Sequence, residues 1–494
     1  MAQKLTEQEI IRRGKLEKLV ERNVDPFGEK FERTDNSESI KAKAGELTKE
    51  ALEEMNIHVK TAGRIMFIRN MGKASFISIQ DQQGKIQVFL GKDVVGEETY
   101  EIFKLADLGD IVGVEGKIMR TKTGEVTVKA EKYTHLVKAL RPLPEKFHGL
   151  TDVEERYRRR YVDLIVNEEA KKVALTRPRI IRALQNYLDN QGFVEVETSM
   201  LNSVLGGASA RPFVTHHNTL DRNFYLRIAT ELPLKRLLVG GIERVYEIGR
   251  LFRNEGMDTR HNPEFTTVEA YQSYGDIEDM YNLCEGVFRH IAKTVVGTMQ
   301  LPWGDVVVDV EKPFRRAHMV ELIKEKTGID FFSQMSFEEA AKHAKDHGIH
   351  LEKHHTGVGH VINEFFEKYC EEDLIQPTFV YGHPREISPL AKPSKDPRFT
   401  ERFELFIKGS EMANAFSELN NAIDQRNRFE DQVKAKALGD EEASDVDEDF
   451  LEALEYGMPP AGGIGIGIDR LIMLMTNQTS IREVILFPTM RDSK

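Results

Sequence analysis

The segment from Arg244 to Tyr271 contains the densest group of side chains that could do chemistry. Its pattern predicts two strands, 245–253 and 264–271, joined by a polar loop. Because side chains alternate between the faces of a strand, one face gathers an arginine, an acid and two aromatic residues: Arg253, Glu269, Phe265 and Tyr271. Such a group could clamp a phosphate, stack a purine and pair with a cation. A solvated hairpin is the alternative, and the density of polar groups beside aromatic residues argues against it.

A second group of polar residues follows Phe403. The pattern predicts two neighbouring strands, with Glu404 on the first and Glu411 on the second. Two converging carboxylates could bind Mg²⁺, which prefers oxygen ligands and usually bridges to substrate phosphates. Asn414 and Glu418 share one face of the second strand. Isolated glutamates are more often plain surface residues, so this site depends on the carboxylates meeting in space.

A third group combines glycines at every second position from 463 to 467 with Asp469 and Arg470. Only 24 residues follow Arg470, too few for the rest of a dinucleotide-binding fold with its ribose-binding acid. The sequence has no GxxxxGK[ST] loop either, which excludes a P-loop nucleotide site. The pattern instead predicts a strand and a helix start where a nucleotide approaches the backbone and Arg470 meets its phosphates or base.

The first part of the chain is organised differently. A capping box at Thr6 predicts an opening helix, and residues 1–57 form a helical extension. Residues 58–140 then alternate as five short strands, with one helix between the third and the fourth. This order is typical of an OB barrel, which commonly binds single-stranded nucleic acid, although a small barrel of unrelated purpose fits equally well.

Residues 141–170, which begin with Arg-Pro-Leu-Pro, are predicted to form a linker, and 171–494 one large domain that mixes helices with strands. Only two of the 494 residues are cysteines, which argues against a disulfide framework or a zinc site and favours a reducing cytoplasm. No apolar stretch reaches the length of about 20 residues needed to span a bilayer. The net charge of −12 argues against non-specific DNA binding but leaves room for local basic patches.

Together these segments resemble the class II aminoacyl-tRNA synthetases. Residues 252–255 and 260–265 resemble their motif 2, residues 463–470 their motif 3, and residues 191–198 the dimer-forming motif 1. The N-terminal barrel indicates the subclass of the lysine, aspartate and asparagine enzymes. The whole chain, including 206–213, is most similar to lysyl-tRNA synthetases of bacterial type. Two positions depart from the pattern: Ser199 replaces the motif 1 proline, and Ala413 replaces a glycine.

This resemblance implies an α+β protein, with an OB-fold anticodon-binding barrel followed by a catalytic domain built on an antiparallel sheet flanked by helices. It implies ATP-dependent activation of L-lysine, transfer to tRNA(Lys), a cytoplasmic homodimer and Mg²⁺ as cofactor. The implied catalytic residues are Arg253 and Arg470. The implied ATP-binding residues are Arg253, Glu255, His261, Asn262, Phe265, Glu404 and Arg470, with Phe265 and Arg470 on either side of the adenine. The implied metal ligands are Glu404 and Glu411.

The implied lysine-binding residues are Gly207, Glu231, Arg253, Glu269, Tyr271, Asn414 and Glu418. In the barrel, the implied anticodon-reading residues are Arg69, Phe76 and Gln87. Three acids at the end of the pocket would repel aspartate. With asparagine bound, the carboxylates of the pocket would stay unpaired, which argues against the sister enzymes. Two further alternatives are a paralogue that modifies a protein and an RNA-binding regulator. The first generally lacks the barrel, and the second has no need of the Glu404 and Glu411 pair.

Overall fold

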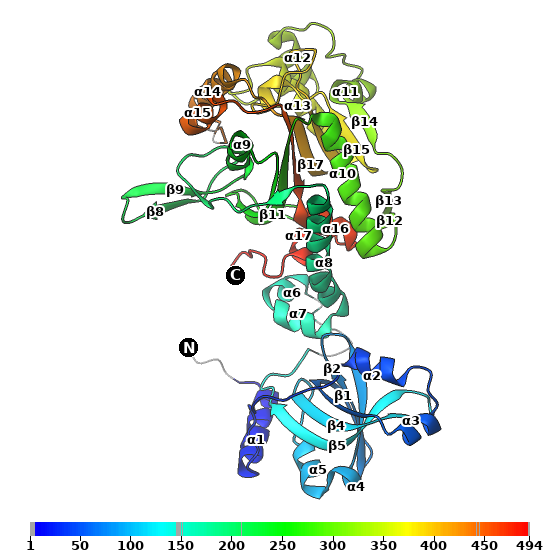
Figure 1. Cartoon of the computed structure of the whole chain (residues 1–494). Helices are drawn as coiled ribbons and strands as arrows, with labels where there is room; N and C mark the ends of the chain where they lie inside the picture. Colours follow the sequence, from blue (N-terminus) through cyan, green and yellow to red (C-terminus); the bar gives the residue numbers. More distant parts are fainter. Residues whose placement is uncertain are drawn as a thin grey trace. The chain divides into compact units, whose positions relative to one another are not determined.

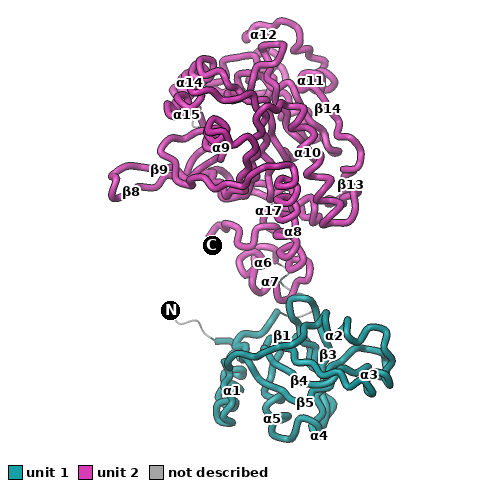
Figure 2. The backbone as a smooth tube through the Cα atoms, in the orientation of Figure 1, with its two compact units in different colours: residues 1–150 teal, residues 151–494 magenta. Residues whose placement is uncertain are grey.

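The computed structural model describes residues 5–144, 150, 152–208, 210–440, 442–443 and 445–492. The chain forms two compact units, residues 1–150 and 151–494 (Figure 2). Helices α6 (Val153–Arg158) and α7 (Arg160–Val166) belong to the second unit, although they lie in the segment predicted as a linker. The finer division of the chain into four segments stays a prediction. Ser209, within the segment 206–213, lies outside the described residues.

The first unit opens with the predicted helix α1 (Glu7–Glu21). Its capping box is present, because the Thr6 hydroxyl accepts from the Glu9 amide and the Glu9 carboxylate accepts from the Thr6 amide. Two short helices follow, α2 (Ser37–Ala44) and α3 (Lys49–Met55). Both lie within residues 1–57, the segment predicted as a helical extension.

Five strands close into a barrel in the order β1-β2-β3-β5-β4, which confirms the predicted OB architecture. Their bounds are β1 His58–Asn70, β2 Ala74–Gln80, β3 Lys85–Gly91, β4 Ile111–Arg120 and β5 Val126–Val137. Helices α4 (Lys92–Val95) and α5 (Glu97–Phe103) lie between the third and fourth strands. Alternate residues such as Ile77, Val88 and Val114 are fully buried and fill the barrel interior.

The second unit is built on an eight-stranded sheet in the order β14-β15-β16-β17-β18-β11-β10-β6. The bounds are β6 Val194–Glu195, β10 Arg244–Phe252, β11 Glu264–Ser273, β14 Arg315–His318, β15 Thr378–Tyr381, β16 Arg402–Ile407, β17 Ser410–Ser417 and β18 Ala461–Gly467. The sheet is antiparallel except at its two edges, where β14 pairs with β15 and β6 pairs with β10 in parallel. The predicted antiparallel sheet is therefore confirmed, with its central strands drawn from three distant parts of the sequence.

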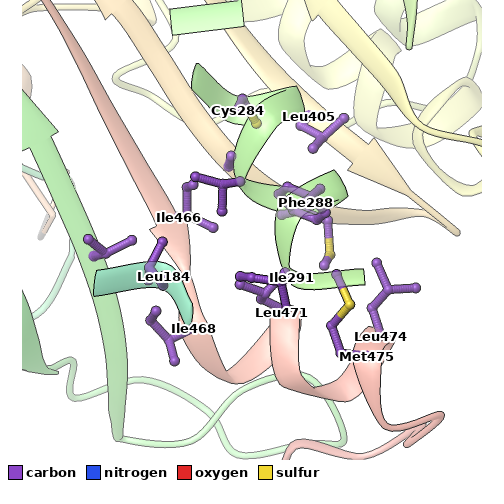
Figure 3. Packing of buried hydrophobic residues seen from close by; sticks show 14 of the residues in the cluster. Leu184, Cys284, Phe288, Ile291, Leu405, Ile466, Ile468, Leu471, Leu474 and Met475 are labelled. Atoms are coloured by element: carbon purple, nitrogen blue, oxygen red, sulfur yellow. The ribbon is translucent and has the colours of Figure 1, made fainter. Parts of the chain in front are cut away.

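One face of this sheet is apolar. It packs against α8 (Glu168–Asn190), α10 (Ile277–Ile291) and α16 (Ile468–Met475), as Figure 1 shows. Figure 3 shows how Ile466 of the central strand meets α8 and α10 in this core. Because Ile464 and Ile466 point into the core, the glycines that alternate with them must face the other side.

The opposite side of the sheet carries α9 (Glu231–Val239), α14 (Ala422–Ala437) and α15 (Glu448–Glu455). A separate apolar cluster holds α11 (Met319–Thr327), α12 (Phe337–Asp346) and α13 (Val358–Tyr369) together. The other short elements are β7 Leu201–Asn202, β8 Val214–His217, β9 Arg222–Leu226, η1 Ala292–Val296, β12 Gln300–Trp303, β13 Val306–Asp309, η2 Glu371–Asp373, η3 Arg385–Ile387 and α17 Ile481–Val484. None of the helices among the described residues has both the length and the apolarity to cross a bilayer.

The tight packing around Ile466 leads us to expect a loss of stability when this side chain is shortened. We expect Ile466→Ala to lower the free energy of unfolding of the second unit by about 2–5 kcal/mol, because it leaves a cavity in a tightly packed cluster. Trp303 is the chain's single tryptophan and lies in the same cluster, so its fluorescence during denaturant unfolding reports this change. Ile423→Ala, at a position 78% exposed, is the control and should change stability by less than about 0.5 kcal/mol.

Candidate active site

The polar face of the large sheet forms the floor of a cavity of about 1160 Å³. Such a volume is enough for a nucleotide together with an amino acid. The cavity brings together residues that are far apart in the sequence. Those among the predicted site residues that line it are Gly207, Glu231, Arg253, Glu255, His261, Asn262, Phe265, Glu269, Tyr271, Glu404, Glu411, Asn414 and Arg470.

Strand register sets the central row of this floor. Glu269 on β11 lies opposite Gly465 on β18, Gly465 lies opposite Asn414 on β17, and Asn414 lies opposite Glu404 on β16. A second row runs in the same way through Tyr271, Gly463, Phe416 and Arg402. Residues directly opposite each other in neighbouring strands have their side chains on the same face. The register therefore joins the first two groups of polar residues into a single surface.

The glycines of β18 leave different amounts of free space. A Cβ at Gly463 would overlap the Glu418 carboxylate and the Tyr271 ring, so only glycine lets Glu418 approach the cavity floor there. At Gly465 the nearest atoms to an added Cβ would be Glu269 Cγ at 3.7 Å and the Asn414 carbonyl oxygen at 4.0 Å. Packing within the chain therefore requires glycine at position 463 but tolerates a methyl group at position 465.

Arg253 follows directly after β10, and its backbone amide donates to the Pro263 carbonyl at 2.8 Å. Its guanidinium carbon lies 5.2 Å from the centre of the Phe265 ring. Within the part of the chain that the structure describes, the buried Nε of Arg253 has no hydrogen-bond partner. A buried donor without a partner is costly, so this guanidinium is suited to receive an anionic ligand.

Arg470 lies on the first turn of α16 and is held near the mouth of the cavity. The preceding Asp469 accepts from the Thr266 amide and from Arg177, each at 2.6 Å, which fixes the start of the helix. Arg470 itself donates to the Glu411 carbonyl at 2.5 Å and lies 3.4 Å from His261 Nε2. Because Asp258 contacts the other ring nitrogen of His261, that histidine is held in one orientation.

Three carboxylates gather at the far end of the cavity. Glu231 and Glu269 line it and are each 7% exposed, whereas Glu418 is 1% exposed and lies behind Gly463 and Phe416. Glu269 accepts from the Thr230 amide and the Tyr271 hydroxyl, both at 3.0 Å. Burial and then the charge of Glu231 raise the pKa of Glu269 above its ordinary value.

Other predicted residues have structural contacts as well. Asn262 donates to the Glu264 carbonyl at 2.7 Å and accepts from the Thr489 amide. It therefore links the C-terminal segment around Thr489 to the loop after β10 by hydrogen bonds. Glu255 is exposed at the rim of the cavity. Gly207 has φ of +89°, a left-handed conformation that favours glycine. These three residues line the cavity without forming ion pairs across it.

Glu404 and Glu411 belong to a larger acidic wall. Burial, Glu367, Glu404 and Glu411 together raise the pKa of Glu371 to about 7. Arg402 partly neutralises this wall, since it donates to Glu404 at 2.5 Å and to Asn414 at 3.1 Å. The described residues contain no group of three His, Cys, Asp or Glu side chains arranged to hold a metal ion by themselves. The oxygen donors therefore suit Mg²⁺ only if water and substrate phosphates complete its shell.

The three predicted anticodon-reading residues lie together on the outside of the barrel. Phe76 on β2 pairs in register with Arg69 on β1 and Phe89 on β3, and the two phenylalanine rings are 5.1 Å apart. Gln87 lies two residues before Phe89 and accepts from the Thr127 hydroxyl at 2.8 Å. An exposed arginine and two half-buried aromatic rings form a surface suited to unpaired bases.

Sequence reasoning missed two charged residues that contact the predicted ones. Lys235 on α9 forms ion pairs with Glu231 and Glu418, and its spacing from Glu231 on a helix was a usable signal. Arg402 alternates with Glu404 on β16, which places both on one face of the strand. Three histidines at the cavity mouth, His354, His355 and His360, also line it, and nothing in their spacing indicated this.

The chain is similar over nearly its whole length to proteins named Lysine--tRNA ligase. The relative from Lactococcus lactis subsp. cremoris (strain MG1363) is 61% identical over 490 residues, covering 99% of each chain. The relative from Streptococcus sanguinis (strain SK36) is 59% identical, also covering 99% of each chain. The relative from Lysinibacillus sphaericus (strain C3-41) is 57% identical, covering 99% of this chain and 98% of the relative.

Two family models match the two parts of the chain. Residues 59–136 match the OB-fold nucleic acid binding domain. Residues 152–491 match the tRNA synthetases class II (D, K and N). Both matches confirm the resemblance indicated by the motifs. The chain therefore belongs to the class II tRNA synthetases of the D, K and N group, with an OB-fold domain before its synthetase domain.

Proposed function

We propose that this chain uses ATP to activate L-lysine as lysyl-adenylate and then transfers the lysyl group to the 3′ end of tRNA(Lys). The observation that carries this proposal is the cavity itself, which has an unpaired guanidinium on one wall and buried carboxylates at its end. Free lysine carries a carboxylate at one end and an ammonium group at the other. Relatives at 57–61% identity that are named Lysine--tRNA ligase support the same substrate.

In the first step, the lysine carboxylate attacks the α-phosphorus of ATP in line, and pyrophosphate leaves. No protein nucleophile is required, so the residues act by positioning and by neutralising charge. Arg253 binds the substrate carboxylate and the α-phosphate, since the buried Nε of its guanidinium has no hydrogen-bond partner among the described residues. In the second step, the terminal hydroxyl of the tRNA attacks the adenylate carbonyl and AMP leaves.

ATP binds between the loop that follows β10 and the start of α16. Phe265 and Arg470 hold the adenine from opposite sides, which uses the aromatic face of one and the planar guanidinium of the other. His261 supports Arg470, from which it lies 3.4 Å. Glu255 and Asn262 complete this part of the site, Glu255 at the rim and Asn262 by holding the loop in place.

The side chain of lysine extends along the row from Glu269 to Asn414 toward the acidic end of the cavity. Each close carboxylate attracts its ammonium group by about 4 kcal/mol if the effective dielectric constant is near 20. An uncharged side chain would leave the same buried carboxylates unpaired, which permits discrimination by factors of roughly 10⁴ without an editing step. Gly207, Tyr271 and Glu418 complete the pocket, and aspartate would be repelled from it.

Glu404 and Glu411 would hold Mg²⁺, and Glu367 and Glu371 line the same wall of the cavity. Burial, followed by the charges of Glu367, Glu404 and Glu411, raises the pKa of Glu371 to about 7, so a bound cation would be favoured beside this wall. When bound, the ion neutralises the ATP phosphates. Arg402 orients Glu404 and Asn414 together, and thereby joins the metal-binding edge to the lysine pocket.

We further propose that the enzyme is a cytoplasmic homodimer. In and just after the motif 1 segment, Val194, Met200 and Leu201 are between 45% and 52% exposed, which is unusual for large apolar side chains so close in sequence. Thr198 in the same segment donates to Glu247 at 2.7 Å, so the backbone beside Ser199 is fixed without a proline. The β6 edge is short and open to pairing with a second copy.

The substrate is tested by ATP–pyrophosphate exchange run separately with each of the common amino acids, and lysine is expected to support exchange best.

In Glu269→Gln, we expect lysine-dependent exchange to fall at least about tenfold, a loss near 1.4 kcal/mol. The amide keeps the shape but loses the charge. The variant should be as stable as the wild type. The raised pKa of Glu269 means that the ionised carboxylate destabilises the folded state, and the neutral amide avoids this cost. Unchanged exchange would remove Glu269 from the pocket, and Glu278→Gln, on an exposed carboxylate, serves as the control.

The floor of the pocket is tested by Gly465→Ala. The added methyl group fits against the chain but projects between Glu269 and Asn414, where the substrate is proposed to lie. We expect the KM for lysine to rise at least about tenfold while the unfolding midpoint changes little. The neighbouring Ile466→Val, whose side chain points into the core, should leave this KM unchanged. A wild-type KM in Gly465→Ala would place the substrate elsewhere.

The barrel is tested by Phe76→Ala, which removes a stacking surface. Loss of one base stack costs about 1–3 kcal/mol, so the KM for tRNA(Lys) in the charging reaction should rise roughly 5- to 100-fold. Pyrophosphate exchange without tRNA should stay at the wild-type rate, because it uses only the second unit. Phe27→Ala, at an exposed phenylalanine of the same unit, is the matched control. Equal tRNA kinetics in both variants would contradict the proposed anticodon surface.

A further inference from the structure

Lys235 is buried with no exposed surface. It lies one helical turn after Glu231 on α9 and forms an ion pair with that carboxylate. On its other side, its Nζ lies 2.5 Å from Glu418 Oε2. The ring faces of Phe416 and Phe450 enclose it at 5.3 and 6.0 Å. Lys235 thus joins two of the three acids at the end of the cavity without lining the cavity itself.

Stability alone does not explain this ammonium group. Replacing a buried ion pair by well-packed apolar groups is often neutral or stabilising. The rings of Phe416 and Phe450 pack around Lys235, so apolar side chains could fill this space if its two carboxylate partners were replaced as well. The charge of Lys235 therefore needs an explanation in the site that it adjoins.

The number of charges around the pocket supplies that explanation. Counted in their ionised forms, Glu231, Glu269 and Glu418 carry three negative charges, and Lys235 and Arg253 carry two positive ones, so this set of five groups has one net negative charge. Lysine at neutral pH has two ammonium groups and one carboxylate, so it brings one net positive charge. Its complex with the site is neutral. Without Lys235 the same complex would keep an uncompensated buried charge, which is unfavourable in a low-dielectric site.

We propose that Lys235 is a positioning residue that determines specificity: its ammonium group favours the ionised form of Glu418 and holds Glu231 and Glu418 in place, so that the pocket accepts one further cationic side chain. This inference rests on the proposed lysine substrate. It assigns Lys235 no contact with the substrate, because two carboxylates transmit its effect. The unpaired Oε1 of Glu418, next to Gly463, is then the oxygen left for the substrate ammonium group.

The ionisation of Glu418 gives this role a measurable pH dependence. The charged and titratable groups that face Glu418 are Lys235 and Glu231 from α9, and Glu269 and Tyr271 from β11. Burial and the two acids raise the pKa of Glu418, and Lys235 acts against them. Loss of Lys235 would raise this pKa further. Lysine binding, which needs the ionised carboxylate, would then require a higher pH.

The test compares Lys235→Met with wild type in lysine-dependent pyrophosphate exchange, using norleucine as the uncharged analogue. We expect the KM for lysine to rise at least about tenfold, with kcat and the KM for ATP within about threefold. The preference for lysine over norleucine should fall at least about tenfold. The KM for lysine is measured as a function of pH in both proteins. The midpoint of this pH dependence should lie at least about one pH unit higher in Lys235→Met than in the wild type. Lys235→Arg keeps the charge and should retain most of the preference for lysine.

Arg236→Met is the matched control, because Arg236 lies on the same helix and pairs with Asp447 away from the cavity. If it matches Lys235→Met in all readouts, or if Lys235→Met lowers only stability and kcat, Lys235 is structural and the inference is wrong. Loss of preference in Lys235→Arg also overturns it. Should Lys235→Met not fold, Lys235→Gln takes its place. Absence of lysine-dependent exchange in the wild type would instead contradict the proposed function.

Discussion

The alternation of side chains along five adjacent strands is the constraint on which the second unit depends. Within β18, Ile464 and Ile466 enter the apolar core, while the glycines between them leave space on the opposite face. The same parity holds on β11, where Val268 and Ala270 are core residues and Glu269 faces the cavity. A slip of one residue in any of these strands would bury carboxylates in the core and expose isoleucines to the cavity. Core packing therefore fixes the register that assembles the site.

That register brings charges together at a cost to stability. Glu231, Glu269 and Glu418 are all nearly buried, and ionised carboxylates are unfavourable there unless they are paired. The chain compensates for part of this cost with Lys235, and in the acidic wall with Arg402. Among the described residues, it leaves the buried Nε of Arg253 without a hydrogen-bond partner on the other side. The residual unpaired groups, one guanidinium and a net acidic end, match the two ends of the proposed substrate.

The sequence predicted where strands and helices lie better than it predicted which of them are neighbours in space. Strand periodicity placed Glu269 and Tyr271 on one face, and the capping box at Thr6 located α1 within a residue. Periodicity does not say which strands lie side by side, so the row through Gly465 and Glu404 could not be derived without the family resemblance. Lys235 was missed for a related reason. Its spacing from Glu231 was visible, but its second partner, Glu418, is nearly two hundred residues away and becomes a neighbour only in the folded chain.

A pocket that recognises its substrate by charge discriminates unevenly. When an amino acid without a cationic side chain binds, the buried carboxylates have no partner, and its binding is weakened by the cost of unsatisfied buried charges. Against a shorter cationic side chain, the charge is still neutralised, and only the contacts of the missing methylene groups are lost, about 1–3 kcal/mol each. Glu269 lies on β11 and Glu418 directly follows β17, so the two carboxylates approach from either side of β18 and fix how far an ammonium group must reach. Discrimination by length therefore depends on the rigidity of these three strands, whereas discrimination by charge depends on the number of carboxylates that Lys235 leaves unpaired.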